Sequence, residues 1–156
     1  KYEGTPRLLM EDTGINSGFM ILQYTSAALV SENKGLCFPS SADSIPTSLG
    51  QEDHVSMGSI GSRKALRVID NLEKIIAIEL LCAAQEFDFR KPLKSSEILD
   101  DVHDKIREKI DFASEDRIFS IDIENAIQLI RERELLSTAS FHADSYSEYD
   151  NLFESY

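Results

Sequence analysis

Three side chains that can hold or move protons follow one another after Gly50: Glu52, Asp53 and His54. Carboxylates and imidazoles perform general acid–base chemistry when their surroundings tune their pKa values. The three residues precede a long helical pattern, and backbone N–H groups at a helix start favour negative charge. Glu52 therefore has two interpretations: a carboxylate that takes part in chemistry, or one that only serves a helix N-terminus.

The neighbours of Glu52 have structural interpretations of their own. Asp53 is expected to cap the helix or form an ion pair, and His54 to be a hydrogen-bonded structural histidine, so neither joins the catalytic set. The three histidines, His54, His103 and His142, lie far apart and show no metal-ligand spacing. No metal site is expected.

Two further clusters of charged residues are expected to be structural. One should form a solvated helix face: Asp100, Asp101, His103 and Asp104. The other could bind an anion, but acidic residues at helical spacings favour an ion-pair network: Arg63, Lys64 and Arg67, with Asp70, Glu73 and Lys74 following.

Two long helices should position these residues. Asn16 or Ser17 can cap the first, whose apolar residues spread over most faces between Phe19 and Val30. A loop rich in Pro, Ser and Gly then leads to Glu52. From about Asp53 or Ser56 to Phe87 no proline interrupts the second helix, whose later half is apolar on more than one face. Both helices should be buried among others.

Two shorter helices should follow. Ser95 or Ser96 can cap one that continues to about Ile110, and Asp122 or Ser120 can cap another that ends between residues 131 and 134. The sequence therefore predicts an all-α fold: long buried helices of a helical-bundle core plus shorter peripheral helices. Residues 1–136 should form this helical region, and the acidic residues 137–156 a flexible tail.

Bulk properties exclude some partners. The 156 residues carry 28 Asp and Glu against 16 Lys and Arg, a net charge of −12 that repels nucleic acids and anionic lipid. The run from Phe19 to Val30 is too short and too polar to cross a bilayer. Cys37 and Cys82 have no disulfide pattern, which favours free thiols and a cytoplasmic location. A first residue Lys1 in place of Met suggests a cut piece of a longer protein.

Several segments, in order, resemble the C-terminal part of the histidine ammonia-lyases, a branch of the aromatic amino acid lyase family. The resemblance covers residues 14–131 almost continuously, and the matching stretches are Asn16–Met20, Ala27–Lys34, Asp43–Ser48, Gln51–Gly58 and Arg63–Val68. Family members acting on phenylalanine or tyrosine usually have an amide where this chain has Glu52. The carboxylate therefore indicates the histidine branch.

The resemblance implies elimination of ammonia from L-histidine to give urocanate, in histidine degradation, by a helical homotetramer. It assigns Glu52 as a catalytic residue, and implies a methylidene-imidazolone (MIO) group that the family forms from an internal Ala-Ser-Gly. That tripeptide is absent: Ala113-Ser114 continues into Glu115, and Ala139-Ser140 into Phe141. No cofactor is expected within this fragment, and the fragment alone should be inactive.

One departure from the family lies beside Glu52, because the family often has Ala-Asn where this chain has Leu49-Gly50. This difference is expected to change the path of the loop while keeping the carboxylate. A different class of function also remains open: a non-catalytic helical scaffold or interaction protein derived from the lyase fold.

Overall fold

The computed structural model describes residues 4–42, 44–52, 54–55 and 58–143. Residues 141–143 are described by their backbone only. These residues form α-helices and two short 3-10 turns, and the only β pairing among them is two isolated bridges. The elements are η1 (Arg7–Leu9), α1 (Met20–Leu36), η2 (Ser48–Gly50), α2 (Gly58–Phe89), α3 (Glu97–Arg107), α4 (Phe119–Arg131) and α5 (Glu134–Ala143). The predicted all-α class is confirmed. No described helix is both long and apolar enough to cross a membrane.

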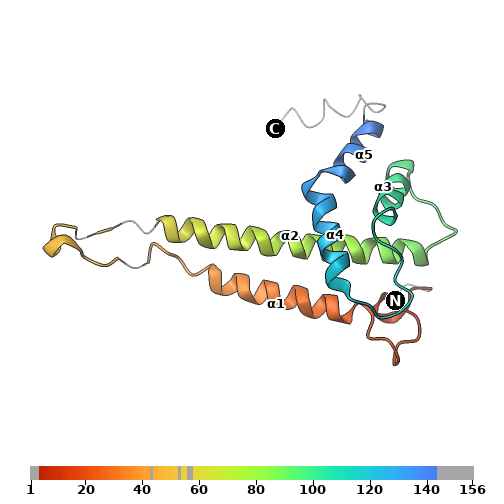
Figure 1. Ribbon diagram of the computed structural model, residues 1–156, viewed down its shortest axis with the longest axis horizontal. Helices are drawn as coiled ribbons and strands as arrows, with labels where there is room; N and C mark the ends of the chain where they lie inside the picture. The colour runs from red at the N-terminus through yellow and green to blue at the C-terminus, as the bar shows by residue number, and fades with distance from the viewer. Residues whose placement is uncertain (1–3, 43, 53, 56–57, 144–156) are drawn as a thin grey trace. The chain divides into compact units, whose positions relative to one another are not determined.

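The chain divides into two compact units. The first comprises residues 1–22 and 77–156, and the second residues 23–76, so α1 and α2 each contribute to both. Figure 1 shows α1 and α2 as the long helices and α3, α4 and α5 as shorter ones.

The first unit contains the hydrophobic core. The second half of α2 contributes Ala77, Ile78, Leu81 and Ala84, which are buried as the sequence predicts. Phe19 and Phe119 meet edge to face, with ring centroids 5.3 Å apart. The rest of the core is Met10, Leu22, Ile106, Ile110, Ala113, Ala126, Ile127 and Leu129. Burial of this apolar surface is the main force that holds the short helices against α2.

The start of α1 is held by a residue far away in the sequence. The Asp116 carboxylate accepts hydrogen bonds from the backbone N–H groups of Ser17 (2.7 Å) and Gly18 (2.8 Å). Asn16 accepts instead from the backbone N–H of Asp116, at 3.3 Å. The anion that serves this helix start is therefore Asp116, rather than the side chain of Asn16 or Ser17 that the sequence suggested.

The predicted cap of α3 is confirmed, and the predicted cap of α4 is wrong. The Ser96 hydroxyl accepts from the backbone N–H of Leu99, and the charges of α3 match its dipole, acidic at the start and basic at the end. Helix α4 begins earlier than predicted, with Ile118 at the cap position and no side-chain cap. Asp122 lies in its first turn and accepts from Arg117 Nε at 2.8 Å.

The fifth helix was not predicted. Helix α5 continues past Leu136 to Ala143, so the first residues of the predicted tail are helical, and residues 144–156 lie outside the described part. It packs against α3 and α4. Glu134 at its start pairs with Lys105 of α3 and with Lys109 just after α3.

The second unit contains most of α1 and the first part of α2. The two helices run antiparallel, joined by the loop that contains η2 (Figure 1). Glu32 of α1 accepts hydrogen bonds from Arg67 (3.2 Å) and Asn71 (2.8 Å) of α2. These hydrogen bonds join the two helices. They also lower the pKa of the Glu32 carboxyl, the bond from Asn71 first and that from Arg67 second.

Much apolar surface of the second unit is exposed. Along α2 a stripe of four side chains is 43–63% exposed: Leu66, Ile69, Leu72 and Ile76. Leu72 and Ile76 were expected to be buried among several helices, and in this chain they are not. We call these four residues the α2 stripe.

Candidate functional site

Glu52 lies at the end of a tight paired turn within the second unit. Thr47 and Glu52 form an antiparallel bridge: the Thr47 N–H donates to the Glu52 carbonyl at 3.0 Å, and the Glu52 N–H donates to the Thr47 carbonyl at 3.2 Å. Outside this bridge, the Val55 N–H donates to the Ser44 hydroxyl at 2.8 Å. The backbone of Glu52 is thus held on both its polar groups, and its side chain is exposed.

The turn between the bridged residues has an unusual backbone. Ser48, Leu49 and Gly50 have φ values of 53°, 59° and 89°, all in the left-handed region. Each such residue other than glycine costs about 1–2 kcal/mol. Leu49, at the tip, is fully exposed. The departure Leu49-Gly50 therefore places glycine at the position with the most positive φ of the three.

Glu52 lies six positions before Gly58, the first described residue of α2. Helix α2 begins at Gly58, and its first turn contains no acidic residue. The expected helix start at Asp53 or Ser56 falls on residues outside the described part.

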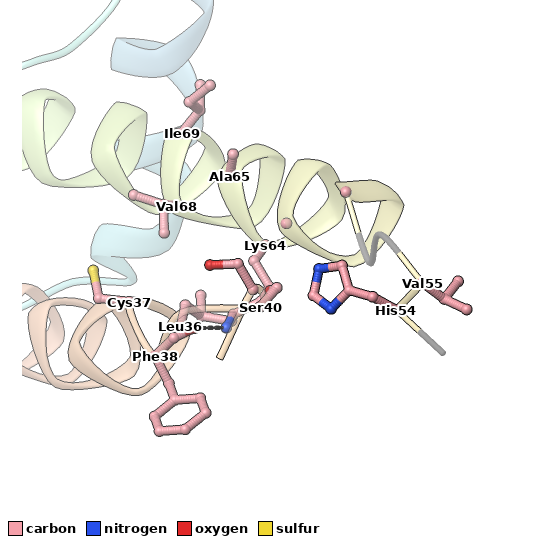
Figure 2. A pocket seen from close by; sticks show the side chains of 13 residues that line it. Leu36, Cys37, Phe38, Ser40, His54, Val55, Lys64, Ala65, Val68 and Ile69 are labelled. Atoms are coloured by element: carbon pink, nitrogen blue, oxygen red, sulfur yellow. Dashed lines mark hydrogen bonds between the residues drawn. The ribbon is translucent and has the colours of Figure 1, made fainter. Parts of the chain in front are cut away.

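A groove of about 620 Å³ lies in the same unit as the turn. Its lining is mostly apolar and includes Leu36, Phe38, Val55, Ala65, Val68 and Ile69. Its polar lining includes His54, Lys64, Ser40 and Cys37. In Figure 2 the His54 ring points towards the side of the groove that carries Lys64 and Ser40. Glu52 is not part of this lining.

The basic cluster of α2 lies partly along this groove. Lys64 donates to the backbone carbonyl of Phe38, and its ammonium lies 5.9 Å from the centre of the Phe38 ring. Arg67 pairs with Glu32 of α1. The contacts seen for these two cations therefore reach across to α1 and the loop after it, whereas the sequence predicted partners on α2 itself.

A second group of titratable side chains lies in the first unit. His103 is buried, with its ring stacked on Phe87 at 4.7 Å and its Nε2 3.2 Å from the Asp88 carboxylate. Burial would raise the pKa of the Asp88 carboxyl, but hydrogen bonds from Lys91 and Arg107 outweigh it and lower that pKa. The prediction that His103 belongs to a solvated face is wrong, because the ring turns inward onto α2.

The two cysteines are free, Cys37 exposed and Cys82 partly buried. Burial, followed by the charge of Glu79, raises the pKa of the Cys82 thiol. Within the described residues no three His, Cys, Asp or Glu side chains gather as metal ligands would.

Comparison with known proteins places this chain among its relatives. A model of the family "Aromatic amino acid lyase" matches residues 1–108, well over half of the chain. The chain belongs to the aromatic amino acid lyase family. The all-α fold agrees with this family, since the solved structures that resemble the chain are helical ammonia-lyase and aminomutase enzymes.

Individual lyases match over most of this chain. It is 53% identical over 134 residues to the histidine ammonia-lyase of Natranaerobius thermophilus, a match that covers 86% of this chain and 26% of that protein. It is similar to the crystal structure of histidine ammonia-lyase from Trypanosoma cruzi, with a TM-score of 0.83, 48% identity, and coverage of 87% of this chain and 27% of that one.

A relative named for a different activity is less similar. The tyrosine aminomutase from Streptomyces globisporus has a TM-score of 0.77 and 34% identity, over 85% of this chain and 25% of that one. The chain therefore spans about a quarter of the length of the lyases it matches. The recognition of histidine ammonia-lyase relatives from sequence segments is confirmed.

Proposed function

We propose that this chain is part of a histidine ammonia-lyase, which eliminates ammonia from L-histidine to give urocanate in histidine degradation. The observation that carries the proposal is the higher identity to histidine ammonia-lyases than to the tyrosine aminomutase, over a similar share of the chain. Exposed free Cys37 suits a reducing compartment, and we take the cytoplasm as the location.

Glu52 is the catalytic residue that this chain contributes. Elimination must remove a weakly acidic proton next to the imidazole of histidine, so a carboxylate that accepts a hydrogen bond from the imidazole, or a proton, assists the reaction. The exposed side chain on a backbone held by Thr47 supports this role. An amide at the same place could neither carry the charge nor take the proton.

The family's methylidene-imidazolone group supplies the electrophile that activates the substrate when it is present. The residues of this chain do not fit its formation. Ala113, in one of the two Ala-Ser pairs, is buried, and its backbone is hydrogen-bonded to Gln85. Glu115 follows this pair where the tripeptide Ala-Ser-Gly would have glycine. The electrophile must come from residues that this chain does not contain, and the 156 residues alone should not release ammonia.

A homotetramer, as the resemblance implies, agrees with the exposed apolar surface of the second unit. Monomeric proteins rarely expose a contiguous apolar stripe such as the α2 stripe. We propose that other parts of the lyase cover it, from the same polypeptide or from another subunit.

The test uses the full-length lyase that contains this segment. Glu52→Gln and Glu52→Ala should lower turnover of L-histidine by about two orders of magnitude or more, measured by the ultraviolet absorbance of urocanate. L-tyrosine should not be a substrate of the unmodified enzyme. Turnover of tyrosine in preference to histidine would refute the substrate, and wild-type turnover in both variants would refute the role of Glu52.

A further inference from the structure

Short-range backbone hydrogen bonds hold the turn before Glu52. The Thr47 carbonyl accepts from two N–H groups, those of Gly50 at 3.1 Å and Glu52 at 3.2 Å. The Gln51 N–H donates to the Ser48 carbonyl, also at 3.1 Å. To return to Thr47 in so few residues, the chain takes a left-handed path through residues 48–50.

Gly50 is the residue of this turn whose type matters most for that path. Its φ of 89° lies in a region that L side chains rarely adopt, and a Cβ built there would meet no heavy atom within 4 Å. A side chain at this position would therefore be resisted by its own backbone and by nothing else. Replacing Gly50 changes the preferred shape of the turn without disturbing any packing.

We propose that Gly50 is a positioning residue for Glu52: its left-handed backbone closes the Thr47–Glu52 bridge and so fixes where the carboxylate stands. This inference rests on the proposed function of Glu52. Backbone strain held in an exposed turn beside a reactive group is how proteins commonly preorganise such a group. Because the turn is exposed and packs little, its shape should matter to turnover far more than to stability.

The chain offers a matched control for the strain itself. Gly4 has a φ of 93° and, like Gly50, no heavy atom within 4 Å of a built Cβ. Gly4 belongs to the first unit, and the Glu52 turn belongs to the second. Gly4→Ala and Gly50→Ala therefore impose a similar backbone penalty, and only the second one acts on the Thr47–Glu52 bridge.

The experiment compares these variants in the full-length lyase. Gly50→Ala should lower kcat for L-histidine about ten-fold or more with little change in KM, whereas Gly4→Ala should keep the wild-type kcat, and both should unfold at similar temperatures. Gly50→Asn should keep much more activity than Gly50→Ala, because asparagine tolerates positive φ better than other residues with a Cβ.

A double-mutant cycle separates positioning from a general effect. In a Glu52→Gln background, Gly50→Ala should cause no further loss, because the group it positions is already neutral. The proposal is overturned if Gly50→Ala keeps the wild-type kcat, or lowers the activity of Glu52→Gln by the same factor as in wild type. Wild-type turnover in Glu52→Gln alone would overturn the proposed role of Glu52 together with this one.

Discussion

Gln85 and Ala113 exchange two hydrogen bonds across the core of the first unit: Gln85 Nε2 donates to the Ala113 carbonyl at 2.8 Å, and the Ala113 N–H donates to Gln85 Oε1 at 3.2 Å. The same Nε2 also donates to the Leu9 carbonyl at 3.1 Å. Gln85 is 1% exposed, and its single amide fixes η1 and the segment around Ala113 to α2. It also satisfies the buried backbone groups of Ala113.

Gln85→Leu should destabilise the protein strongly. Leucine fills a similar volume but leaves the backbone groups of Ala113 and the carbonyl of Leu9 without their partner, at about 1–3 kcal/mol for each buried group left unpaired. Urea unfolding monitored by circular dichroism measures the loss, which should be at least about 2 kcal/mol. Gln128→Leu, on the exposed face of α4, is the control and should change the free energy of unfolding little. A loss below that of the control would contradict the assigned role of Gln85.

Gly18→Ala should also destabilise the first unit. Its φ is 57°, and a Cβ would lie 2.7 Å from the Leu8 carbonyl oxygen and 2.9 Å from the Met10 Cβ. Overpacking together with a left-handed backbone should cost about 2–4 kcal/mol, measured by urea unfolding.

Gly35→Ala is the control for Gly18→Ala. Gly35 lies within α1 with open space around it and no positive φ, so alanine there should be neutral or stabilising by up to about 1 kcal/mol. Equal effects of the two substitutions would show that the environment of Gly18 is not as described.

Stability should fall in acid through Glu134. Hydrogen bonds, first that from Lys109, lower the pKa of its carboxyl from 4.5 to about 2. Because the folded-state pKa lies below the ordinary value, the stabilisation is complete above about pH 4.5 and is lost as pH falls towards 2. Titration of the side chain by NMR should give a midpoint well below 4.5. In Lys109→Met the midpoint should move towards 4.5; an unchanged midpoint would exclude Lys109 as the cause.

The isolated chain should self-associate through the α2 stripe. Leu66→Glu with Leu72→Glu should lower the apparent mass in light scattering, because charge on an apolar interface opposes its burial. Leu93→Glu is the control: Leu93 is 71% exposed and lies outside the stripe, so its substitution should leave the mass unchanged. A wild-type chain that is strictly monomeric at high concentration would contradict the prediction.

The fold was predictable where local sequence decides it. Helix α3 has its cap residue, Ser96, directly before its first turn, and this cap was predicted. The start of α1 was not, because Asp116 lies about one hundred residues away. Helix α5 was missed because it depends on pairing of Glu134 with Lys105 and Lys109, which only the packed chain brings together.

The candidate site was predictable in part. The position of Glu52 follows from a local match of residues, but its left-handed turn does not, because two of the three residues with positive φ are Ser48 and Leu49, which rarely adopt it. The groove was missed as well. Its walls come from the end of α1, the loop after it and the start of α2, and no periodic pattern joins these segments.

Among the described residues of the second unit, Asn71 is the one fully buried side chain. Helices that lack an apolar interior open by local fluctuation, so their amide protons should exchange with deuterium quickly in the isolated chain, while those around Leu81 and Leu129 should exchange slowly. The part of the chain that presents Glu52 would then become rigid only when other parts of the lyase cover it. The enzyme would become active when it assembles, later than the folding of this segment.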